Sequence, residues 1–428
     1  MSYMFRHTQA FFESRPGYLN TTTWHRLRRS MEIILTTPNG WDLREQSFLR
    51  KVAVNAGLVD QQNAETRVTF VTEAEASIHF ALHHGAVKNW LRKGVMFAVV
   101  DAGGSTVDST LYVCKSSRGP VHLEEVCSSK CVQTKRLFEA DKQSNIIQFG
   151  GPVDNDPSVG VRRGRVSLSA AEVASCFAAP MKDIMDSVRS LIESRKVEFL
   201  VLVGGFGESP YLRQQLKLVF GKGDRSIVVA EEPSRKAAAE GASIWHLTRD
   251  VKSRAVRYTY GCNLEVEYND NYRERMFNCY TDASGVVRVP GAFSPWVIKE
   301  TVLEDNFYHE LTYHYVWEPT SRTIWSELSN RVINIYICDA LVAPLWILDT
   351  QGYPMPGARH LCAVTADLSG LYSELTLQYG FNGRQYYGVQ YSVLIALGGT
   401  QLSARIRWYQ AGVLCEGPAT IIPDVFTQ

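Results

Sequence analysis

Apolar residues follow two different patterns along the chain. In the first 250 residues, short apolar runs alternate with stretches of helical spacing, whereas from Arg257 onward segments alternate between apolar and polar residues. A continuous apolar run is typical of a strand buried on both faces, and alternation is typical of a half-exposed strand. The pattern predicts an α/β domain over residues 1–250 and a β-rich, sandwich-like domain over residues 251–428.

The first domain is predicted to begin as strand, helix, strand, helix. These elements are expected at residues 31–36, 42–57, 67–71 and from residue 72 onward, which places Glu73 at a strand-to-helix junction. Such junctions bind ligands in α/β folds. Ser169 and Glu172 form a capping-box pattern before a long amphipathic helix, and Pro180 inside that helix predicts a kink or a break.

The region around residues 95–113 predicts a strand, a tight glycine turn and a second strand. The turn contains Gly103, Gly104, Ser105 and Thr106, and Asp101 precedes it. Glycines let backbone N–H groups approach an anion closely, and Thr106 adds a hydroxyl donor. A carboxylate beside such a phosphate cradle favours a hydrated divalent cation or a water molecule. The alternative is an ordinary hairpin turn without a ligand.

A second glycine turn follows the apolar strand at residues 197–203. Gly204 and Gly205 come directly after this strand, and a helix begins at about Tyr211. Backbone at such a turn can contact a nucleoside, while the dipole of the next helix attracts its phosphates. Close packing of a helix on a strand also selects glycine, so the motif alone leaves both interpretations open.

Composition and charge narrow the function. Forty-five basic and 44 acidic side chains give a net charge of +1, which disfavours nucleic-acid binding. No apolar stretch is long enough to span a membrane, and no leader is evident, so we expect a cytoplasmic protein.

The nine cysteines are scattered and predict neither a zinc site nor disulfides. His79 and His83 lie one helical turn apart without a third ligand, so we assign them no metal.

Four motifs, in this order, resemble the actin-like ATPase (ribonuclease H-like) superfamily, and within it the heat shock protein 70 family. The resemblance spans roughly Met31 to Leu247. The motifs are Phe70-Val-Thr-Glu-Ala-Glu-Ala-Ser77, Val99-Val-Asp-Ala-Gly-Gly-Ser-Thr-Val-Asp108, Val201-Leu-Val-Gly-Gly-Phe-Gly-Glu-Ser-Pro210 and Lys236-Ala-Ala-Ala-Glu-Gly241. The β-rich part resembles the family's substrate-binding sandwich without its helical lid, as in the divergent, lidless subfamily.

The resemblance implies Mg²⁺ and ATP or ADP as ligands. Asp101 and Glu73 would hold hydrated magnesium and orient the attacking water, with Asp101 as the metal residue. By the same resemblance, the phosphates would be contacted by Gly103, Gly104, Ser105 and Thr106. Gly204 and Gly205 would border the adenosine. Ser105 replaces a third glycine, and Glu208 stands where the family usually has an arginine.

The chain also lacks parts of the family pattern. No Asp-x-Gly-Thr-Thr-x-Ser string, the first phosphate loop, precedes Met31, and the lysine that follows this loop is missing. The helical subdomain that clamps adenine is skipped after Cys131. We therefore expect an incomplete, N-terminally truncated ATPase domain with weak or lost hydrolysis, in a chaperone-like protein whose β-rich domain binds client or partner proteins. The alternatives are a non-enzymatic interaction scaffold and, less favoured, a sugar or acetate kinase.

Overall fold

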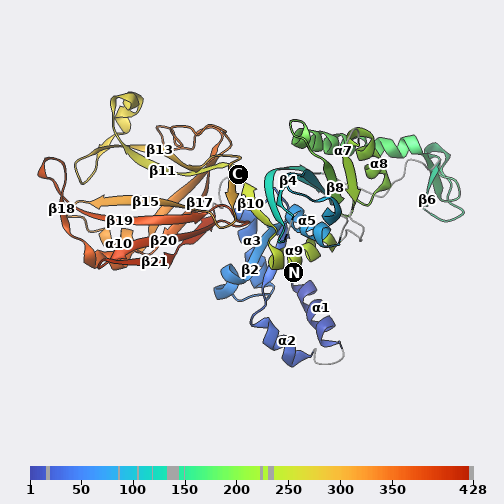
Figure 1. Ribbon diagram of the computed structural model, residues 1–428, viewed down its shortest axis with the longest axis horizontal. Helices are drawn as coiled ribbons and strands as arrows, with labels where there is room; N and C mark the ends of the chain where they lie inside the picture. The colour runs from blue at the N-terminus through green and yellow to red at the C-terminus, as the bar shows by residue number, and fades with distance from the viewer. Residues whose placement is uncertain are drawn as a thin grey trace. The chain divides into compact units, whose positions relative to one another are not determined.

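The computed structural model describes residues 1–428 except 16–19, 85–86, 104–105, 118, 133–143, 149, 222–224, 230–235 and 424–428. The chain forms two compact units (Figure 1). The α/β unit comprises residues 7–41 and 62–252, and the β unit comprises residues 1–6, 42–61 and 253–428. The protein is thus of mixed α/β class with several sheets, as its sequence predicts.

The centre of the α/β unit is a twisted mixed sheet. Its strand order is β10-β5-β4-β3-β8-β9. The strands are β3 (Met96–Ala102), β4 (Thr106–Ser116), β5 (His122–Val132), β8 (Phe199–Val203), β9 (Ser226–Val229) and β10 (Val251–Ala255). β3, β4 and β5 are antiparallel neighbours, whereas β3, β8 and β9 run parallel. The chain leaves the unit within β10, whose later residues pair with β14 (Val302–Glu304) of the β unit.

Helices cover both faces of this sheet (Figure 1). On one face, α7 (Ala170–Ile192) and α8 (Pro210–Phe220) pack against Ala98, Val100 and Leu202. On the other, α5 (Glu73–His84) and α6 (Val87–Trp90) pack against Phe97, Val99 and Val201. Because alternate residues of a strand point to opposite faces, Asp101 belongs to the α5 face.

The unit also contains α2 (Thr21–Arg28), α4 (Ala64–Arg67), α9 (Ala237–Thr248), the parallel pair β1 (Ile33–Thr37) and β2 (Val68–Thr72), and the hairpin β6 (Ser144–Gln148) and β7 (Arg165–Ser169). A further helix, α1 (Ser2–Glu13), begins in the β unit's first residues and continues into this unit.

The predicted capping box of α7 is present. The Ser169 hydroxyl accepts a hydrogen bond from the backbone N–H of Glu172, and the Glu172 carboxylate accepts one from the N–H of Ser169. The helix runs on through Pro180, so no break occurs there. Apolar residues on both sides of Pro180, among them Phe177 and Met181, pack on the same sheet face, and this burial outweighs the missing backbone hydrogen bond.

The β unit consists of two sheets that enclose one apolar core. One sheet has the order β12-β13-β11-β16-β17-β22, and the other β15-β19-β20-β21 with β18 also paired to β19. Both sheets contribute buried core residues, for example Ile335 and Cys362 from the first and Tyr391 and Ile406 from the second. The strands are β11 (Thr259–Glu267), β12 (Tyr280–Thr281), β13 (Val287–Val297), β15 (Tyr308–Trp317), β16 (Arg331–Cys338), β17 (Ala358–Ala366), β18 (Leu377–Tyr379), β19 (Gln385–Ala396), β20 (Ser403–Gln410), β21 (Val413–Pro418) and β22 (Thr420–Pro423). Short helices connect them: η4 (Asp270–Asn278), α10 (Ile324–Ser329) and η5 (Ser369–Glu374).

One helix lies in a different unit from the one expected. The helix α3 (Leu43–Asn55) was predicted as part of the first domain, but residues 42–61 group with the β unit. The Gln46 amide donates to the backbone oxygen of Thr400 at 3.3 Å, and Arg50 donates to the Gln401 side chain at 2.9 Å. These long-range contacts determine where α3 packs. The spacing of residues within the helix does not predict them.

Asp42 is expected to anchor α3 to the β unit. Its carboxylate caps the helix by accepting from the Arg44 N–H and also pairs with Arg359 of β17 at 3.0 Å. Burial acts to raise the pKa of this carboxyl, but the hydrogen bonds from Arg44 and Arg359 outweigh it and lower the pKa. We predict that Asp42→Ala lowers the free energy of unfolding by roughly 1–2 kcal/mol at pH 7.

The sign of the pH dependence follows from the lowered pKa. The carboxylate stabilises the fold above the pKa of an unfolded aspartate, about 4, and this contribution is lost as the pH falls through the lower folded value. Urea unfolding between pH 7 and pH 3 should therefore show the gap between wild type and Asp42→Ala closing at acid pH. Asp60→Ala, which removes an exposed carboxylate, is the control. A gap independent of pH would contradict the prediction.

Candidate functional site

The predicted glycine hairpin is present between β3 and β4. Asp101 is the residue before the last of β3, Gly103 follows the strand, and Thr106 is the first residue of β4. Asp101 pairs directly with Asp108 in the antiparallel register. The strand–turn–strand prediction is thus confirmed, while the predicted phosphate contacts Gly104 and Ser105, at the centre of the turn, lie outside the described residues.

Asp101 is held in place by the helix that carries Glu73. Asp101 is only 8% exposed, and the hydroxyl of Ser77 in α5 donates to its Oδ2 atom at 2.7 Å. Glu73 is the first residue of α5 and lies one turn before Ser77 on the same helix face. The structure therefore turns the Glu73 face of α5 toward the end of β3. Ser77 belongs to the sequence motif, but no role was predicted for it. Its i, i+4 spacing from Glu73 could have indicated that both residues lie on one helix face.

Gly204 brings the second glycine motif against Asp101. β8 is the parallel neighbour of β3, and Val203 is in register with Asp101. Gly204 has a φ of +84°, and a Cβ atom there would overlap the Asp101 carboxylate and lie 2.5 Å from the Ala102 carbonyl oxygen. The N–H groups of Phe206 and Gly207 donate to that same oxygen at 2.7 and 3.2 Å. Glycine is therefore required at residue 204 for both conformation and space.

Gly205 differs from Gly204. A Cβ atom at residue 205 would meet nothing within 4 Å, so no packing contact selects glycine there. Four residues later, Ser209 caps α8 by accepting from the backbone N–H of Leu212, and Pro210 occupies the first turn. A helix N-terminus of this kind presents free N–H groups and a positive dipole end. The turn after β8 thus contains a glycine with free space beside it and leads into a helix with a capped N-terminus.

Helices α5 and α9 pack closely on each other at Gly241. A Cβ atom on Gly241 would overlap the carbonyl oxygen of Ala76 and lie 2.6 Å from its carbon. The indole N–H of Trp245 donates to the fully buried carboxylate of Glu75 at 2.6 Å. Glu75 therefore joins the two helices.

His79 is a structural residue. It is fully buried, its Nδ1 lies 2.8 Å from the backbone oxygen of Glu75, and its Nε2 accepts from the N–H of Asp250 at 3.0 Å. Both ring nitrogens are thus engaged by the protein backbone, with Nδ1 as the donor. His83 is exposed. Within the described ranges, no three histidine, cysteine or acidic side chains gather as metal ligands, and the cysteines there form no disulfide.

The carboxylates at the hairpin nevertheless suit a hydrated divalent cation. Asp101 and Asp108 are both buried and directly opposed, so they share one face with Cβ atoms roughly 5 Å apart. Two close carboxylates favour a bound cation or a shared proton. Mg²⁺ keeps several of its waters and needs only one or two protein carboxylates. Sequence analysis missed Asp108, although it and Asp101 are equidistant from the centre of the turn.

Comparison with known proteins adds no assignment. No model of a protein family matches the chain, and no curated protein matches it significantly. Of the helices in the described part of the chain, none is both long and apolar enough to cross a membrane.

Proposed function

We propose that the α/β unit binds an adenine nucleotide with Mg²⁺, as a divergent relative of the actin-like, heat-shock-70-type ATPases. The observation that carries this proposal is the junction at Asp101. There the glycine hairpin, the glycine turn after β8 and the helix of Glu73 meet through the Ser77 hydrogen bond and the close approach of Gly204. These three segments lie far apart in the sequence, and the resemblance assigns all of them to the same ligand.

In this proposal each segment of the junction has a role. Asp101 and Asp108 would hold the hydrated cation, with Glu73 on the adjoining helix face orienting water. The backbone at Gly103 and the N-terminus of α8 would face phosphate, because N–H groups and a helix dipole attract anions. Gly205, with open space above it, would border the nucleoside. Bound Mg²⁺ would neutralise phosphate charge.

A second function, a non-enzymatic scaffold for partner proteins, is favoured by the same aspartate. One carboxylate oxygen of Asp101 accepts from Ser77, and the other lies against Gly204. A carboxylate engaged in this way stabilises the junction of β3, β8 and α5 even without a ligand. In this alternative the hairpin only stabilises the α/β unit, and the β unit carries the function.

Isothermal titration of the full chain with MgATP and MgADP tests the proposal. We expect heat of binding that disappears when EDTA replaces Mg²⁺, and affinity at least about tenfold weaker in Asp101→Asn, since a charged hydrogen-bond partner of the cation shell is lost. Asp60→Asn, in the β unit, should bind like wild type. Absence of binding to the wild-type chain, together with a lowered unfolding midpoint for Asp101→Asn, would favour the scaffold instead.

A further inference from the structure

The outer face of the sheet β15-β19-β20-β21 carries a group of polar side chains directed away from the core. Ser392 of β19 pairs in register with Arg407 of β20. Because alternate residues of a strand share a face, Gln390 and Tyr409 lie on the same face as these two residues. Tyr391, between Gln390 and Ser392, points the other way and belongs to the core. The four side chains are therefore available to a ligand on the outer face.

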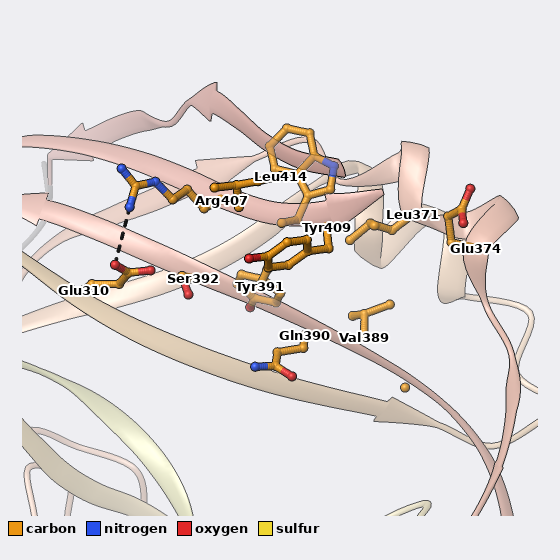
Figure 2. Close-up of a pocket in the computed structure, with 12 residues that line it drawn as sticks. Glu310, Leu371, Glu374, Val389, Gln390, Tyr391, Ser392, Arg407, Tyr409 and Leu414 are labelled. Atoms are coloured by element: carbon orange, nitrogen blue, oxygen red, sulfur yellow. Dashed lines mark ion pairs between the residues drawn. The ribbon is translucent and has the colours of Figure 1, made fainter. Parts of the chain in front are cut away.

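These four side chains line a pocket of about 490 Å³. Figure 2 shows the ion pair of Arg407 with Glu310 at one end of the pocket, Leu371 and Glu374 at the other, and Tyr409 between them. The volume lies within the range of small-ligand sites. The pocket therefore suits a small molecule, or a few units of a polymer.

Tyr409 and Leu414 form an apolar platform in this pocket. They are direct partners on β20 and β21, so their Cβ atoms lie roughly 5 Å apart on one face. Tyr409 is 67% exposed and Leu414 is 53% exposed, so the core does not require either side chain. A phenol ring presents a flat apolar surface and, at its edge, a hydroxyl group. The platform can therefore stack against a ligand that has a flat face of C–H groups.

The polar groups of the pocket offer both hydrogen-bond donors and acceptors. Arg407 supplies N–H donors, and the carboxylates of Glu310 and Glu374 supply acceptors. The Gln390 amide and the Ser392 hydroxyl supply both. A ligand hydroxyl also donates and accepts, so a ligand with several hydroxyls can pair with every one of these groups. A sugar ring carries such hydroxyls on its edge and C–H groups on its faces.

The charges of the pocket favour a neutral ligand. Arg407 contacts Glu310 at 3.5 Å and Glu416 at 2.7 Å, so its positive charge is already compensated. An anion would gain little from Arg407 and would be repelled by Glu374. A cation would be attracted by Glu374 but would offer no acceptor to the N–H groups of Arg407 and Gln390. A neutral ligand with hydroxyl groups avoids both losses.

We propose that this pocket binds a neutral carbohydrate through one sugar ring stacked on Tyr409 and Leu414. The hydroxyls of that ring bond to Gln390, Ser392 and Arg407. All of these contacts come from side chains on one face of the sheet. The site lies wholly in the β unit, and the proposal does not depend on nucleotide binding.

Isothermal titration of the full chain at pH 7 tests the proposal with four probes. Cellotriose and maltotriose are neutral trisaccharides, trigalacturonate is an anionic one, and spermidine is a small cation without hydroxyls. We expect at least one neutral trisaccharide to bind at least about tenfold more tightly than trigalacturonate or spermidine, because only a neutral sugar satisfies the donors and acceptors without repulsion. Failure of both neutral trisaccharides to bind would overturn the proposal. Equal or tighter binding of either charged probe would also overturn it.

Variants of Tyr409 locate the site. Tyr409→Ala removes the stacking ring and should weaken binding of the neutral trisaccharide by at least about tenfold, whereas Tyr409→Phe keeps the ring and should retain most of the affinity. The matched control is Tyr353→Ala, which removes a tyrosine of similar exposure outside the pocket and should leave the affinity unchanged. Urea unfolding should show the same midpoint for all three variants, since both tyrosines are exposed. Wild-type affinity in Tyr409→Ala, or equal losses in Tyr409→Ala and Tyr409→Phe, would refute stacking on this ring and with it the proposed site.

Discussion

Replacing Gly241 with valine is expected to lower the free energy of unfolding of the α/β unit by about 3 kcal/mol. A side chain at this residue would collide with the backbone of Ala76 in α5, whose carbonyl carbon would lie 2.6 Å from the new Cβ atom, and with the Cβ atom of Phe80 at 3.2 Å. Both obstacles belong to a packed helix, so α5 and α9 must move apart. The loss would include the buried contact of Trp245 with Glu75.

Urea unfolding followed by tryptophan fluorescence measures this effect, since Trp245 is fully buried at the contact. The control is Gly205→Ala in the same unit, where a new Cβ atom has no neighbour within 4 Å and which should change stability little. If Gly241→Val unfolded at the wild-type urea concentration, close packing of α5 on α9 would be wrong.

Local patterns predicted the elements around the candidate site. The apolar run before Asp101 and the glycines after it define a hairpin through turn chemistry alone, and β4 does pair antiparallel to β3. The glycine turn after β8 was predicted equally well, but its glycines could serve either ligand binding or close packing of a helix on a strand. The structure shows that Gly204 is demanded by packing on Asp101 and by its positive φ, whereas Gly205 is not. The pattern thus located the turn without separating the roles of its two glycines.

The sequence did not predict the features that depend on contacts between residues far apart in the chain. The amphipathic pattern of α3 gives a helix, but its unit is decided by Thr400, Gln401 and Arg359, more than 300 residues away. The pairing of both β18 and β20 with β19 likewise joins segments whose own alternation does not identify their partner. Register and partner choice in sheets depend on which faces are buried together, and alternation along one strand does not specify its neighbours.

The chain of 428 residues is expected to release phosphate from ATP at a rate close to background. Phosphoryl transfer requires positioned groups that stabilise charge from several sides. The sequence contains neither the first phosphate loop nor its lysine, and removing one comparable donor typically costs on the order of a hundredfold to a thousandfold in rate. The structure supplies a second reason: the Ser77 hydroxyl already donates to one carboxylate oxygen of Asp101, which makes that oxygen a weaker base toward an attacking water.

A steady-state phosphate-release assay checks this expectation, with Asp101→Asn as the test variant and Asp60→Asn as its control. If Asp101 mainly binds a hydrated cation and stabilises the junction, Asp101→Asn should weaken nucleotide binding but leave the already small rate nearly unchanged. The pairing of a lost binding heat with an unaltered rate is specific to a site that binds without useful turnover. Turnover well above background that Asp101→Asn abolishes and Asp60→Asn preserves would instead show a working ATPase, in which the Ser77 hydrogen bond positions a catalytic carboxylate.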